Sequence, residues 1–118
     1  MPPIDPQTEI DAEKEKAVAI LDQKIIDAIK LQNATGAPEM PAVINDLMTQ
    51  RTTIFVQHYI GSMHHPDMLK ALAIMKAATT DMTNVAATMK KVADYVAKVA
   101  GLLSGGAKVV TGLKGIIG

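Results

Sequence analysis

Apolar residues recur along the chain at helical spacing, and almost no stretch alternates apolar and polar residues as a half-buried strand does. The pattern predicts three helices, over about residues 6–33, 41–62 and 66–118. Gly36 can end the first helix in a left-handed conformation, and Pro66 disfavours helix just before the third. We therefore expect an all-α fold, a helical hairpin or three-helix arrangement, in one domain of 118 residues.

The third predicted helix carries an apolar residue at every seventh position, and small or apolar residues three positions later. This is the a/d pattern of a coiled-coil seam. Uninterrupted, such a helix would be roughly 75–80 Å long, so the first two helices would cover only part of its seam. We expect the seam to form an assembly interface through Met68, Met75, Met82, Met89, Val96, Leu103, Val110, Ile117, Val85, Val92 and Val99.

The last eighteen residues, GLLSGGAKVVTGLKGIIG, keep the heptad phase although they are rich in glycine. Each interior glycine costs a helix roughly 1 kcal/mol relative to alanine, so this segment needs a packed neighbour. Small residues let two helix backbones approach closely. Ala97, Gly101 and Gly105, four residues apart, are the positions at which we expect close approach between helices of the assembly.

The composition fits thin, closely spaced helices, because the chain has eight Met, one Phe, two Tyr and no Trp. The absence of Cys excludes disulfides, thiolate metal sites and a cysteine nucleophile. The net charge is zero, but residues 1–33 hold seven acids and four lysines, whereas only Lys98, Lys108 and Lys114 follow Asp94. This asymmetry favours head-to-tail or antiparallel association, and it is too small to indicate nucleic-acid binding.

Few residues suggest site chemistry. His58, His64 and His65 are weak candidate metal ligands, because their spacing is not that of a metal-binding helix. Arg51 and His58 fall on the apolar side of the second helix. We interpret them as a polar contact at an interface, where it would set the register between the packed helices. A buried arginine needs a partner, so we expect Arg51 to meet an acid of the first helix or of a neighbouring subunit. No catalytic constellation, cofactor motif or small-molecule substrate site is predicted, and we do not expect an enzyme.

These features favour a structural, self-assembling helical subunit that forms a filament, tube or symmetric oligomer with other copies. One alternative is a membrane-associating or pore-related protein that acts through the cationic, glycine-rich segment 99–118. Another is a soluble adaptor whose seam binds a partner helix. The N-terminal sequence lacks the basic and apolar runs of a secretory signal, so we expect a cytoplasmic protein or one exported by a dedicated machine.

Overall fold

The computed structural model describes residues 6–57 and 65–115, and these residues form four helices and no strand. The helices are α1 (Pro6–Thr35), α2 (Met40–Phe55), α3 (His65–Ala87) and α4 (Val92–Gly115). The all-α prediction is therefore confirmed, with four helices in place of the expected two or three.

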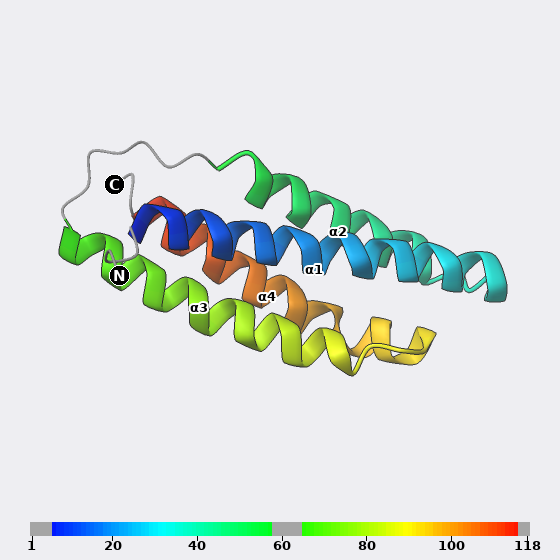
Figure 1. Ribbon diagram of the computed structural model, residues 1–118. Helices are drawn as coiled ribbons and strands as arrows, with labels where there is room; N and C mark the ends of the chain where they lie inside the picture. Colours follow the sequence, from blue (N-terminus) through cyan, green and yellow to red (C-terminus); the bar gives the residue numbers. More distant parts are fainter. Residues whose placement is uncertain (1–5, 58–64, 116–118) are drawn as a thin grey trace.

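The four helices form a bundle in which consecutive helices run in opposite directions (Figure 1). Helix α1 packs against α2 and α3, and α4 packs against the same two helices from the other side. Helices α1 and α4 meet more lightly across the middle of the bundle. The α1–α2 pair and the α3–α4 pair are thus opposite edges of a bundle that measures 49 × 27 × 18 Å.

The first helix and the start of the second lie close to the residues predicted from the sequence, whereas the second helix ends earlier than predicted. Helix α1 stops at Gly36, whose φ of 66° is left-handed and whose N–H donates to the Gln32 carbonyl at 2.8 Å. Helix α2 has Pro41 in its first turn, where the missing N–H costs nothing. It ends at Phe55, and most of its predicted continuation to residue 62 lies outside the described residues.

The expectation of one helix over residues 66–118 is wrong, because the chain turns at residues 88–91 and α4 returns along α3. At the end of α3, the N–H groups of Thr88 and Met89 donate to carbonyls three residues earlier, at 3.0 and 3.1 Å. The Asp94 carboxylate then accepts the N–H groups of Lys90 and Lys91 at 3.2 and 3.0 Å. These bonds satisfy backbone groups that a helix start leaves without partners, so Asp94 caps α4.

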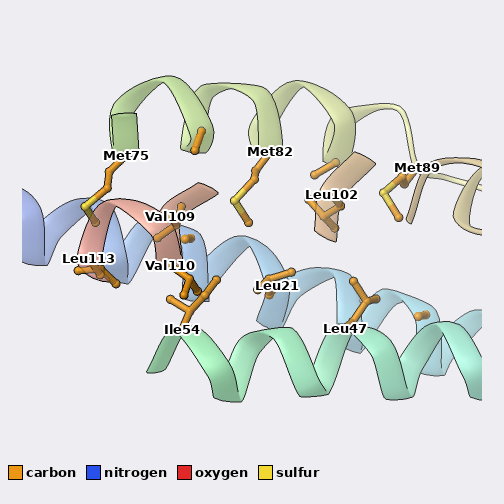
Figure 2. Close-up of a cluster of buried hydrophobic side chains, with 14 of the residues drawn as sticks. Leu21, Leu47, Ile54, Met75, Met82, Met89, Leu102, Val109, Val110 and Leu113 are labelled. Atoms are coloured by element: carbon orange, nitrogen blue, oxygen red, sulfur yellow. The ribbon is translucent and has the colours of Figure 1, made fainter. Parts of the chain in front are cut away.

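The hydrophobic effect explains why the chain folds back. A straight helix would leave the methionine stripe of α3 in water, whereas the return of α4 covers it. Burying a methionine side chain contributes about 1.5–3 kcal/mol. The core therefore fills with mainly aliphatic and thioether side chains, and with the Tyr95 ring, from all four helices (Figure 2). Its largest fully buried members are Tyr95, Ile10, Leu21, Met40, Leu47, Ile54, Met75, Met82, Met89, Leu102, Leu113 and Val109.

Candidate interaction surfaces

The methionines of the predicted seam lie inside the chain's own core. Met75 and Met82 of α3 are 0% exposed and Met89 of the α3–α4 turn is 1% exposed, and all three point toward the other helices (Figure 2). Contact between these methionines and another copy would require the bundle to open. Met68 belongs to α3, and Ile117 lies outside the described residues.

The heptad phase shifts by one residue at the turn. Along α4 the core positions are Tyr95, Leu102 and Val109, each one residue before a predicted a position. Val96 is consequently 47% exposed. The other predicted seam residues of α3 and α4 are buried or partly buried among the four helices: Val110, Val85, Val92, Val99 and Leu103.

Two glycines of α4 receive two methionines of α3, and this interlock sets the spacing of the α3–α4 pair. A Cβ added at Gly105 would lie 2.5 Å from Met82 Cγ, and one added at Gly112 would lie 2.8 Å from Met75 Cγ. The two glycines are seven residues apart in α4, and the two methionines are seven residues apart in α3. Two turns of one helix therefore match two turns of the other. Gly105 therefore does set a close approach, but within the chain; whether it also acts between copies stays a prediction.

The outward side of α4 carries little charge among the residues whose side chains the structure describes. We call it the α4 outer face; among those residues Lys108 is the exposed charged one, and Asp94 and Lys98 are half-buried. Its exposed members are Ala93, Val96, Ala97, Ala100, Gly101, Ser104, Ala107, Lys108 and Thr111. A helix on the surface of a monomer usually turns charged and polar side chains outward. Helix α1 follows that rule, with Asp11, Glu15 and Lys16 among its exposed residues.

A groove of about 450 Å³ borders the α4 outer face, between the end of α3 and the start of α4. We call it the α3–α4 groove, and it is lined by Asn84, Val85, Thr88, Ala97, Lys98 and Gly101. A Cβ added at Gly101 would meet only the Val85 methyl carbons, both at 3.8 Å, so the groove can hold one methyl group at this glycine. Lys98 is its one charged lining residue.

A second groove, of about 410 Å³, lies on the opposite edge of the bundle, where Phe55 of α2 meets α1. We call it the α1–α2 groove, and it is lined by Asp11, Lys14, Glu15, Val18, Ala19, Asp22 and Phe55. Sequence analysis did not single out Phe55. It is 54% exposed, although aromatic rings usually bury most of their surface.

Cations cover part of the Phe55 ring. The Arg51 guanidinium carbon lies 4.9 Å from the ring centroid, and the Lys14 ammonium lies 5.9 Å from it. Both cations also have polar partners, because Arg51 Nε donates to the Asp22 carboxylate at 2.9 Å and Lys14 donates to the Gln57 carbonyl. The expectation that Arg51 pairs with an acid of the first helix is confirmed, whereas His58 lies outside the described residues.

Glu13 is a buried acid that sequence analysis missed. Its side chain accepts a hydrogen bond from the Thr79 hydroxyl of α3, and the Lys16 ammonium lies 3.4 Å from its other carboxylate oxygen. Glu13 lies three residues after Ile10 and four before Ala17, both fully buried. That spacing places Glu13 on the core side of α1. The same spacing, read from the sequence, could have identified Glu13 as a buried acid.

Lys24 ties α1 to the α3–α4 turn. Its ammonium donates to the Met89 carbonyl at 3.1 Å, lies 3.7 Å from the Asp27 carboxylate and stands 5.8 Å from the Tyr95 ring centroid. The Tyr95 hydroxyl is buried and has no hydrogen-bond partner among the described residues. Burial, with a smaller effect from the Asp27 charge, raises the pKa of Tyr95 to about 12.

The candidate metal ligands are not assembled within the described part of the chain. His58 and His64 lie outside it, and His65 is the first residue of α3. Residues 6–57 and 65–115 contain no group of three or more His, Cys, Asp or Glu side chains placed to hold a metal ion. What these residues do offer is surface for another molecule: the α4 outer face and the two grooves.

The described residues thus define a four-helix bundle of the all-α class, and the α1–α2 groove and the α3–α4 groove lie at its opposite edges. Among them, α4 is the helix whose length and composition would suffice to cross a membrane, with a mean hydropathy of 1.3 over Val92–Leu113. Comparison of the chain with protein-family models, curated proteins and solved structures found no match.

Proposed function

We propose that this protein is a structural subunit that assembles with further copies of itself through the α4 outer face. The observation that carries the proposal is the chemistry of α4. Its residues Val92–Leu113 have a mean hydropathy of 1.3, yet only 39% of the residues in an 18-residue part of this stretch are buried inside the bundle. A helix that is apolar on its inner side and nearly uncharged on its outer side is typical of one that is covered on both sides.

The outer side suits a protein neighbour. Ala97, Gly101 and Ser104 have small side chains, so the backbone of another helix can come close to this face. Val96, Ala97 and Gly101 belong to the interface predicted from sequence and are exposed. The self-assembly proposal therefore keeps these three residues and does not require the buried methionines to leave the core.

Light scattering after size exclusion tests this proposal. The unaltered chain should show a mass that rises above the 12.5 kDa of one chain as its concentration increases. Ala97→Glu adds a charge to the α4 outer face and should hold the mass near that of one chain. Ala77→Glu makes the same change at an exposed position of α3 and serves as the matched control. Equal masses for the two variants would exclude the α4 outer face as the interface.

A membrane surface is the second candidate partner, and the length and composition of α4 favour it. Lys98 and Lys108 would then contact anionic headgroups while small and apolar residues meet the acyl boundary. Co-sedimentation of the full chain with anionic and with neutral vesicles separates the two candidates. Pelleting with vesicles at concentrations where the chain alone is monomeric would support lipid as the partner. An adaptor role has less support, because the seam proposed for a partner helix is packed in the core.

A further inference from the structure

We propose that the α4 outer face of one copy binds the α1–α2 groove of the next, with Phe55 inserted in the α3–α4 groove. This inference rests on the proposed function and adds the surface that α4 meets. The occupant is a second copy of this chain, and the contact is heterologous, because two different surfaces of the same molecule meet.

The first argument is shape. Phe55 is a large side chain that is 54% exposed on one edge of the bundle, and its neighbours Val18 and Ala19 line the same groove. On the opposite edge, the α3–α4 groove has a volume of about 450 Å³, and Gly101 lines it without a side chain. An aromatic ring in that space would gain apolar contacts with Val85 and Ala97 that it lacks in the single chain.

The second argument is charge. The α1–α2 groove is lined by three acids and one lysine, and that lysine, Lys14, already donates to the Gln57 carbonyl. Asp22 is paired with Arg51, whereas Asp11 and Glu15 have no ion-pair partner among the described residues. The α3–α4 groove carries Lys98 as its one charged lining residue. Docking the two grooves would bring Lys98 toward these carboxylates, and such complementarity fixes register.

The third argument is the position of the two surfaces. They lie on opposite edges of the bundle, since α1 with α2 forms one edge and α3 with α4 forms the other. Each copy that docks through one of these surfaces therefore leaves its other surface free to bind a further copy. A heterologous contact repeated in this way builds an open chain of subunits, or a ring where the rotation between copies closes.

Mixing two variants tests this inference. Phe55→Ala removes the inserted ring and should weaken self-association roughly 30-fold, as expected for a central aromatic anchor. Ala97→Glu disables the opposite surface. At concentrations where the unaltered chain assembles but a contact weakened roughly 30-fold does not form, each variant alone should be monomeric. An equimolar mixture should then form a dimer of twice the 12.5 kDa chain mass, because each variant keeps the surface that the other lacks. Circular dichroism should show unchanged helicity for both variants.

The results separate this inference from the proposed function. If Phe55→Ala still assembles while Ala97→Glu does not, the α4 outer face binds another surface, such as its own copy, and the inference is wrong. If the unaltered chain stays monomeric at every concentration, the proposed function fails and the inference fails with it. A mixture that stays monomeric when each variant alone is monomeric also contradicts the heterologous contact.

A charge exchange provides a second test that does not depend on Phe55. Lys98→Glu should weaken assembly about tenfold, because it places a carboxylate opposite Glu15 and Asp11. Adding Glu15→Lys to the same chain should restore most of the loss. Glu39→Lys, which makes the same change at an exposed acid outside the groove, should not restore it. Equal recovery by both exchanges would mean that Lys98 responds to net charge and does not face the α1–α2 groove.

Discussion

Replacing Gly105 with alanine tests the return of α4 along α3, because Gly105 receives Met82. In an ordinary helix interior, Gly→Ala stabilises by roughly 1 kcal/mol. At Gly105, however, the new Cβ would lie 2.5 Å from Met82 Cγ and 3.4 Å from the Ala78 carbonyl oxygen. Carbon atoms in good contact stay about 3.5–4.0 Å apart, so Met82 or the backbone would have to move by about 1 Å.

The expected magnitude follows from these opposing effects. Overpacking of this kind costs typically about 1–3 kcal/mol, so Gly105→Ala should be destabilising by about 0–2 kcal/mol after the propensity gain. Gly101→Ala is the matched control in the same helix, since its Cβ would lie 3.8 Å from Val85, an ordinary contact. It should be stabilising by about 1 kcal/mol. The two variants should therefore differ by about 1–3 kcal/mol.

Urea denaturation followed by circular dichroism measures both variants, with the free energy of unfolding taken from the midpoint and slope. A double-mutant cycle with Met82→Ala should give a coupling energy with Gly105→Ala and none with Gly101→Ala. Equal stabilisation by the two alanines would refute the reasoning, because a straight helix over residues 66–118 exposes both glycines alike.

Further predictions concern the turn and assembly. Tyr95→Phe removes a buried hydroxyl without a described partner and should stabilise the bundle by about 1 kcal/mol. Because the pKa of Tyr95 is raised in the folded state, the unfolded chain loses the hydroxyl proton first as the pH rises. The free energy of unfolding should therefore be constant in this respect below pH 10 and fall between pH 10 and about 12, and the denaturation midpoint of Tyr95→Phe should lack this decline. Backbone hydrogen bonds from Lys91 and then Lys90 hold the pKa of Asp94 below its usual 3.8, so stability should fall as the pH drops below about 4. Asp94→Ala should melt at a lower temperature than the unaltered chain near neutral pH and lose that acid dependence. For assembly, raising the salt concentration should lower the oligomer mass if Lys98 faces acids of another copy.

The sequence identified most helical residues because helix-ending chemistry and apolar spacing agree in the first half of the chain. Gly36 and Pro41 bound the α1–α2 turn, and both have backbone requirements that few other residues meet. The buried line of α1, through Ile10, Ala17 and Leu21, follows the spacing read from the sequence. Local chemistry decides these elements, so their prediction did not depend on distant contacts.

The turn at residues 88–91 could not be read from the heptads, because the apolar pattern continues through it. Residues 95, 102 and 109 are Tyr, Leu and Val, and residues 96, 103 and 110 are Val, Leu and Val, so two phases of α4 fit the same sequence. The choice between them depends on burial against α3 and α2, a long-range effect. No glycine or proline marks the turn; Asp94, which caps α4, was the one local signal.

The candidate surfaces were only partly predictable for the same reason. Ala97 and Gly101 were singled out for their small size and are exposed, but the packing of Gly105 on Met82 depends on how the chain returns. Phe55 lies on the apolar side of α2 in the sequence pattern, yet its position near the end of a short helix leaves it 54% exposed. Exposure of an apolar residue is a property of tertiary packing, which spacing alone does not report.

A spin label at Ser104 tests assembly through the α4 outer face most directly. The chain has no Cys, so Ser104→Cys provides a single attachment site on that face, and Ala77→Cys provides one on α3. Electron paramagnetic resonance should show the Ser104 label mobile in dilute solution and immobilised as the concentration rises, in the absence of lipid, while the Ala77 label stays mobile. A Ser104 label that remains mobile at every concentration would contradict the account.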